Sequence, residues 1–124
     1  MKAIDIIAEL DRVDPNQYTN EIKLGWLRDL DGKIFRELIV THCDFEARER
    51  YTAADYRKGD VVLLVVEPYA QDVYLNYLRS KIAEANAETE RYNLYASAYN
   101  AAYQEYAAWY NRTRCPKWQC GWRY

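Results

Sequence analysis

The side chains that most readily bind metal ions or act as nucleophiles are few in this sequence. Its one histidine, His42, is followed by Cys43, and two further cysteines, Cys115 and Cys120, lie near the carboxyl end. These four residues are zinc ligands in principle, but structural zinc sites usually contain closer pairs than Cys115 and Cys120. An odd number of cysteines in unlike contexts also disfavours a disulfide framework. We therefore expect neither a metal site nor structural disulfides.

Carboxylates are the other candidates for chemistry. Glu84, Glu88, Glu90 and Glu105 fall in a helix-forming part of the sequence, at spacings typical of a solvent-exposed face. Catalysis needs nucleophile, acid–base or metal groups that converge, and the chain also lacks a glycine-rich phosphate loop. We therefore expect no enzyme activity and no cofactor, so that function depends on surfaces that bind other molecules.

Composition favours one small domain with protein-binding character. The chain has 124 residues, the size of a single domain. It contains 13 tyrosines but only 2 phenylalanines, and tyrosine rings suit half-buried surfaces and protein interfaces. No run of 18 apolar residues and no signal-like start is present, so we expect no membrane contact and synthesis in the cytoplasm.

Charge is unevenly distributed along the chain. Residues 1–111 contain 13 Lys and Arg against 19 Asp and Glu, a net charge of −6, whereas residues 112–124 contain four basic residues and no acid, a net charge of +4. The overall net charge of −2 argues against a general nucleic-acid binder, and the tail is a separate electrostatic unit.

Two helices are expected in the first third of the chain. Residues 3–12 have apolar positions at helical spacing, and Pro15 prevents the helix from continuing. A second helix is expected to start near Thr19 or Asn20, either of which can cap it, and to run through residue 39 with an apolar residue at every fourth position. Asp31-Gly32 are weak helix formers that mark either a bend or a break.

The middle of the chain predicts a loop followed by a strand. Residues 43–59 are charged and aperiodic, which is typical of an exposed loop. Residues 61–66 are a β-branched run bounded by Gly59 and Pro68, which is the profile of a strand. A single strand needs a partner, so we expect it to pair with part of residues 44–57 as a hairpin or with the edge of another subunit.

The dominant element is a long helix over residues 69–111. No glycine or proline interrupts the sequence from Tyr69 to Arg114. An unbroken helix of this length would be about 60 Å long, and a hinge within residues 86–93 would shorten it. These elements together predict a mainly α fold, a small helical bundle with one long C-terminal helix and a short β-strand or hairpin inserted between helices 2 and 3. The predicted domain covers residues 1–114 with the insertion at 43–67, and residues 115–124 form a tail.

Six tyrosines lie on one face of the long helix, at steps that average the helical repeat: Tyr92, Tyr95, Tyr99, Tyr103, Tyr106 and Tyr110. This face is predicted to be a core stripe, a subunit interface, or both. The tail is basic and aromatic, and its candidate docking residues are Arg112, Arg114, Lys117, Trp118, Trp122, Arg123 and Tyr124. Such a tail either folds back over the core, docks in a groove of a partner, or contacts DNA phosphates.

The order and spacing of several short motifs give the sequence a family resemblance. They are Asp14-Pro15-Asn16 to Tyr18, Lys23 with Trp26-Leu27, Leu30-Asp31-Gly32, Pro68-Tyr69 to Tyr74, Tyr77-Leu78, Asn86, Glu90-Arg91-Tyr92-Asn93, Tyr99-Asn100, Tyr103, Tyr110-Asn111-Arg112 and Pro116-Lys117. On these residues the chain resembles the head-tail connector, or adaptor, proteins of tailed bacteriophages and prophages. The resemblance spans nearly the whole chain apart from residues 43–60, and the Trp- and Cys-rich tail departs from it.

The resemblance implies a structural subunit of the virion at the head-tail interface. Such adaptors form a homo-oligomeric ring beneath the portal protein, contact a neighbouring head-tail or tail-completion protein, and let DNA pass through the lumen without specific binding. By this likeness the tyrosine face, with Asn93, Asn100 and Asn111, contains intersubunit or core positions, and residues 115–124 form the arm that docks on the portal. The alternative is a small nucleic-acid-binding module, in packaging or regulation, that uses the basic aromatic tail.

Overall fold

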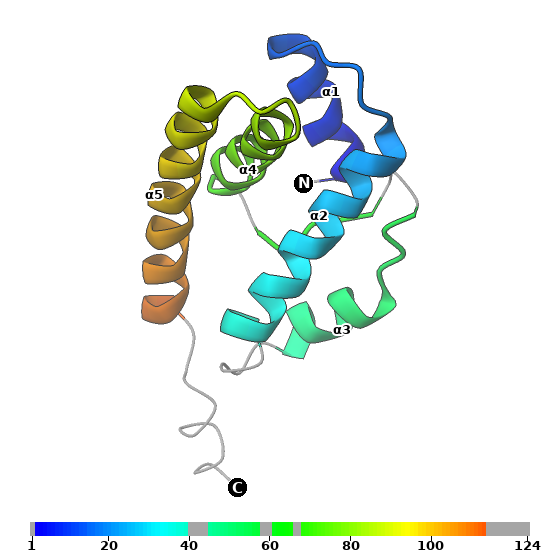
Figure 1. Cartoon of the computed structure of the whole chain (residues 1–124). Helices are drawn as coiled ribbons and strands as arrows, with labels where there is room; N and C mark the ends of the chain where they lie inside the picture. The colour runs from blue at the N-terminus through cyan, green and yellow to red at the C-terminus, as the bar shows by residue number, and fades with distance from the viewer. Residues whose placement is uncertain (1, 40–44, 58–60, 66–67, 114–124) are drawn as a thin grey trace, which may run out of the picture.

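Helices account for most of the chain in the computed structural model, which describes residues 2–39, 45–57, 61–65 and 68–113 (Figure 1). In these residues the elements are α1 (Ala3–Val13), α2 (Asn20–Ile34), the π-helical turn η1 (Phe35–Ile39), α3 (Phe45–Ala53), α4 (Ala70–Ala85) and α5 (Thr89–Thr113). The mainly α fold class is therefore confirmed.

The first two helices begin and end close to the residues expected from the sequence. The hydroxyl of Thr19 accepts a hydrogen bond from the backbone N–H of Ile22 at 3.4 Å, so Thr19 caps α2. Asp31 and Gly32 both lie within α2 and are buried, so the helix does not break at these residues. Its hydrogen bonding changes only from Phe35 onward, where the chain widens into η1.

The predicted strand or hairpin in the insertion is wrong. Residues 45–53 of the expected loop form α3, and in residues 61–65 the only β pairing is one antiparallel bridge between Lys2 and Val62. The apolar run is instead an extended core segment, with Leu63 and Val65 almost completely buried. The backbone N–H groups of Leu64 and Val65 donate hydrogen bonds to the side chains of Asp31 and Tyr74, so these groups are buried without a partner strand. Residue 66 lies outside the described residues.

The long helix is interrupted, as the hinge prediction allowed, and the unbroken 60 Å rod is wrong. Residues 86–88 form a tight turn between α4 and α5, in which Ala87 has a φ of 58°. The backbone N–H of Glu88 bonds to the carbonyl of Ala83 at 2.9 Å, which closes the end of α4. The two helices fold back against each other (Figure 1), so α5 packs on its own chain along its length.

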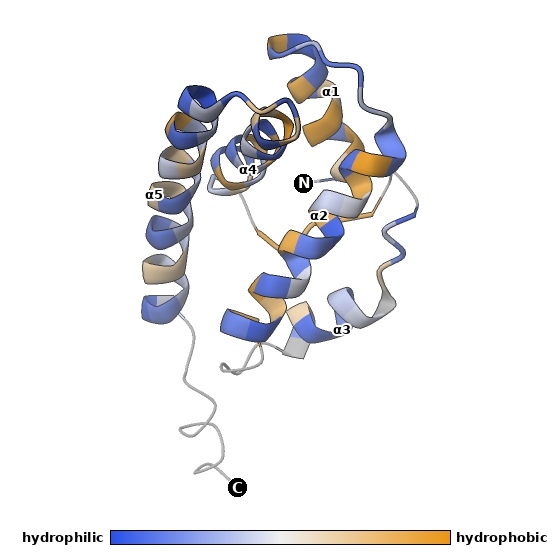
Figure 2. Ribbon diagram, in the orientation of Figure 1, coloured by the Kyte–Doolittle hydropathy of each residue, from blue (hydrophilic) through white to orange (hydrophobic). Residues whose placement is uncertain are grey.

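The core lies where α1, α2 and α4 meet the 61–65 segment, and α5 covers one side of it. Figure 2 shows the apolar sides of α1 and α2 turned toward the interior. The most deeply buried residues include Ile6, Leu10, Leu27, Ile34 and Leu78. This core holds α2 at the centre of the molecule, with α5 on one side of it and the segment after α3 on the other (Figure 1).

Candidate functional site

The carboxyl-terminal half of the tyrosine face packs inside the chain. Tyr99, Tyr106 and Tyr110 are 8%, 1% and 2% exposed. The ring of Tyr99 meets the ring of Tyr77 from α4 edge-on at 5.2 Å, and that of Tyr106 lies 6.0 Å from the ring of Tyr69. Such aromatic pairs stabilise a helix contact beyond the area that they bury. This half of the face is therefore a core stripe of the α4–α5 pair.

Tyr103 connects α5 to the end of α2 and to η1. Its hydroxyl donates a hydrogen bond to Glu37 at 2.5 Å, and the ammonium of Lys33 lies 5.2 Å from its ring centre. Partial burial, together with the negative charge of Glu37, raises the pKa of Tyr103 above its ordinary value. The phenol therefore stays protonated and acts as a hydrogen-bond donor.

The amino-terminal half of α5 is more open to solvent. Tyr95 is half-buried under the guanidinium of Arg79, which lies 4.4 Å from the ring centre and donates to the phenol oxygen at 2.9 Å. Tyr92 is 37% exposed, and Asn93 and Asn100 are exposed as well. Leu94 is 64% exposed, the largest exposed fraction of the large apolar residues in the described chain. Tyr92, Asn93 and Asn100 therefore remain accessible to another molecule, whereas the buried tyrosines do not.

Only the first residue of the predicted docking tail falls within the described residues. Arg112 is exposed in the last turn of α5. The remaining residues of that prediction lie outside the described residues: Arg114, Lys117, Trp118, Trp122, Arg123 and Tyr124.

A buried carboxylate forms an interior cluster that the sequence did not reveal. Asp31 is 0% exposed and accepts hydrogen bonds from the hydroxyls of Tyr56 and Tyr74 and from the backbone N–H of Leu64. The hydroxyl of Tyr74 in turn accepts from the N–H of Val65 at 2.9 Å. Burial raises the pKa of Asp31 to about 6, although its hydrogen bonds oppose the shift. The cluster joins α2 and α4 to the two segments on either side of residues 58–60.

The signal for this cluster was present in the sequence but was ambiguous. Asp31 occupies a position within the apolar stripe of α2, between Leu30 and Ile34. A single acid at this position is compatible with a buried polar residue and also with a weak helix former. From the sequence, Asp31-Gly32 are predicted to be weak helix formers that mark a bend or a break. Its partners are 25 to 43 residues away, so no local spacing connects them.

A second polar cluster lies at the end of the bundle where α1 meets the α4–α5 turn. The carboxylate of Asp14 lies 3.7 Å from Arg79 and 3.6 Å from Arg91. Close by, the hydroxyl of Tyr18 donates to the side-chain oxygen of Asn86 at 2.7 Å. This end cluster thus joins two turns that are about seventy residues apart in the sequence.

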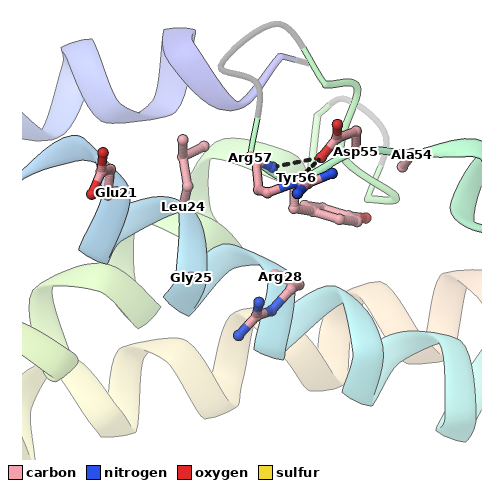
Figure 3. Close-up of a pocket in the computed structure, with 8 residues that line it drawn as sticks. All are labelled: Glu21, Leu24, Gly25, Arg28, Ala54, Asp55, Tyr56 and Arg57. Atoms are coloured by element: carbon pink, nitrogen blue, oxygen red, sulfur yellow. Dashed lines mark hydrogen bonds and ion pairs between the residues drawn. The ribbon is translucent and has the colours of Figure 1, made fainter.

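A groove of about 740 Å³ lies between α2 and the segment that follows α3 (Figure 3). Its lining combines small or apolar residues with two acids and two arginines: Glu21, Leu24, Gly25, Arg28, Ala54, Asp55, Tyr56 and Arg57. The arginine at position 57 is paired with Asp55 at 3.1 Å and has a side chain that is 91% exposed. The volume is in the range of pockets that bind ligands or side chains of a partner.

The described residues contain neither a cluster of metal-binding side chains nor a helix that could span a membrane. Among them, no three His, Cys, Asp or Glu side chains come together as a metal site. No helix of the described chain has both the length and the apolar character needed to cross a membrane. No protein-family model, curated protein or solved structure matches the chain at a significant level.

Proposed function

We propose that this protein is a head-tail connector subunit of a tailed bacteriophage or prophage. In this role it forms a homo-oligomeric ring beneath the portal protein, contacts a neighbouring tail-completion protein, and leaves a lumen for DNA. It acts mechanically, within the virion, after synthesis in the bacterial cytoplasm. The proposal rests on the resemblance of its motifs to this family and on how those motifs lie in the fold.

The observation that carries the proposal is the contact between motifs that are far apart in the sequence. Tyr18 from the first motif bonds to Asn86, and Asp14 pairs with Arg91 from the motif at residues 90–93. The buried Lys23, from another motif, bonds to Asp11 at 2.5 Å, and Asp11 also accepts from the side chain of Asn16 in the first motif at 3.2 Å. The motifs at residues 14–18, 86 and 90–93 therefore meet at one end of the fold, and this contact supports the proposal.

The charge distribution also suits a ring that conducts DNA. An acidic or neutral wall lets a polyanion slide without sticking, and residues 1–111 have a net charge of −6. The net charge of +4 on residues 112–124 favours the alternative, a small nucleic-acid-binding module that uses its tail.

Two measurements distinguish these functions. The full chain is mixed with the candidate portal protein, and the mass of the complex is measured by native mass spectrometry. A complex with many copies of this chain per portal ring supports the adaptor. In parallel, binding to duplex DNA is measured at rising salt concentration. Tight binding that falls steeply with salt, and that is lost when the four basic residues of the tail are replaced by Gln, supports the alternative and contradicts the adaptor.

A further inference from the structure

The groove beside α2 is lined by Gly25, a glycine that no close packing in the described chain requires. Gly25 lies in the interior of α2, where glycine is the least favourable residue apart from proline. A Cβ atom built on Gly25 would meet no heavy atom within 4 Å, outside the backbone of its own helix and its chain neighbours. No close packing within the described residues therefore explains the missing side chain, and the space above Gly25 is open to something else.

The chemistry of the groove indicates what that occupant would contain. Leu24 and Tyr56 give apolar surface beside Gly25, and Arg28 and Arg57 stand at its edges (Figure 3). Arginine guanidinium groups stack on indole rings, with Trp the most favourable partner. The carboxylate of Glu21 can pair with a cation that accompanies such rings. A peptide that contains both aromatic and basic residues can therefore stack on the arginines and pair with the carboxylate.

The tail of the chain has this composition. It places Trp118 and Trp122 four residues apart, with Lys117 and Arg123 next to them. We propose that residues 115–124 of one copy dock in the groove of a second copy, and not on the portal as the resemblance implies, with the indoles over Gly25 and a cation at Glu21. This inference rests on the proposed ring and names the contact that joins its subunits.

The placement of α5 and of the groove on different sides of α2 favours docking between copies (Figure 1). Helix α5 lies on one side of α2, and the segment after α3, which lines the groove, lies on the other side (Figure 1). Residues 112–124 are also attracted to the acidic body of another copy, because residues 112–124 have a net charge of +4 and residues 1–111 a net charge of −6. A donor and an acceptor on different surfaces make a head-to-tail contact, which closes into a ring when the rotation allows.

The test uses three full-length variants in a reducing buffer. Gly25→Leu fills the groove and favours the helix, so the fold is retained. The double variant Trp118→Ala/Trp122→Ala removes the docking rings. Ser97→Leu adds the same side chain at an exposed position of α5 and is the matched control. Mass is measured by analytical ultracentrifugation over a range of concentrations.

Self-association of the wild type and of Ser97→Leu is expected, with at least a tenfold weaker association constant for Gly25→Leu and for the tryptophan variant. A mixture of these two weakened variants keeps one intact groove and one intact tail, so it should form a heterodimer and nothing larger. A wild type that stays monomeric at its highest soluble concentration, or a mixture that gives no heterodimer, overturns the inference.

Failure of this inference and failure of the adaptor proposal are distinguishable. If Gly25→Leu assembles on the portal as well as the wild type does, the inference is wrong and the adaptor stands. If the heterodimer forms but neither protein binds the portal, the docking contact stands and the adaptor function fails. A synthetic peptide of residues 112–124 that binds the tryptophan variant but not a monomeric wild type would show docking within one copy, which also overturns the inference.

Discussion

The two polar clusters of the molecule are built around carboxylates in opposite surroundings. Asp31 is completely buried, and it accepts hydrogen bonds from two tyrosine hydroxyls and a backbone N–H. Asp14 is partly exposed and pairs with the guanidinium groups of Arg79 and Arg91. Buried donors that lose an acceptor are costly, whereas exposed ion pairs contribute little. The interior cluster should therefore control stability, and the end cluster should mainly orient the turns.

The largest difference in stability between the two clusters is expected when the carboxylate of each is removed. Asp31→Ala leaves the buried hydroxyl of Tyr74, the buried N–H of Leu64 and the partly buried hydroxyl of Tyr56 without their acceptor, at a cost of about 1–3 kcal/mol for each buried donor. Loss of the buried carboxylate returns part of this cost, so we expect a net decrease of about 3 kcal/mol in the free energy of unfolding at pH 7. Asp14→Ala, the control, should cost about 1 kcal/mol or less. Urea denaturation measures both, and equal losses would contradict the comparison.

The next difference between the clusters is how the stability contributed by Asp31 depends on pH. The pKa of Asp31 is raised from 3.8 to about 6, so the folded state binds the proton more tightly than the unfolded state does. This stabilisation is complete below pH 4 and is lost as the pH rises through about 6. Other carboxylates also titrate in this range, so the useful quantity is the difference between the wild type and Asp31→Asn.

We expect the wild type to gain about 2 kcal/mol relative to Asp31→Asn between pH 7.5 and pH 4.5. Stability is measured by urea denaturation at both pH values. The same experiment with Asp14→Asn is the control. A difference between wild type and Asp31→Asn that does not change with pH would show that Asp31 is not held in a desolvated site.

A smaller contrast is expected from matched removal of one phenol hydroxyl in each cluster. In the interior, Tyr74→Phe deprives Val65 of its acceptor and Asp31 of a donor, which should cost about 1–3 kcal/mol. At the end of the bundle, Tyr18→Phe removes the hydrogen bond to Asn86. Water can replace this exposed bond, so the change should cost about 0.5 kcal/mol. Thermal unfolding followed by circular dichroism ranks the two variants, and the reverse order would contradict the assignment.

The features of the fold that depend on neighbouring residues were correctly predicted from the sequence. The cap at Thr19, the end of α1 before Pro15 and the helical face of the tyrosines all depend on residues within one or two turns. The strand at residues 61–66 was wrong because a β-branched apolar run reads the same whether it pairs with a strand or is buried among helices. In the fold its N–H groups bond to Asp31 and Tyr74, partners that no local pattern identifies.

The candidate site was predictable to a smaller extent. The periodicity placed the tyrosines on one face of a helix but could not show that α5 would fold back and cover the carboxyl-terminal half of that face. The turn at Ala87 decides this, and its left-handed φ falls on a residue that is not glycine. The groove depends on a helix and a segment about thirty residues apart, so only the structure brings Gly25 and Tyr56 together.

The smallest effect is expected at the exposed ion pairs of the end cluster, and it should respond to salt. Arg91 pairs with both Asp14 and Glu88, and its side chain is 50% exposed. Arg91→Ala should lower the free energy of unfolding by about 0.5 kcal/mol in dilute buffer, and the loss should shrink toward zero near 1 M salt, because salt screens exposed charges. The cost of Tyr74→Phe should stay constant over the same range, since its partners are buried and separated from mobile ions. A salt-independent loss at Arg91 would mean that its packing against Tyr95, and not its charge, holds the two turns together.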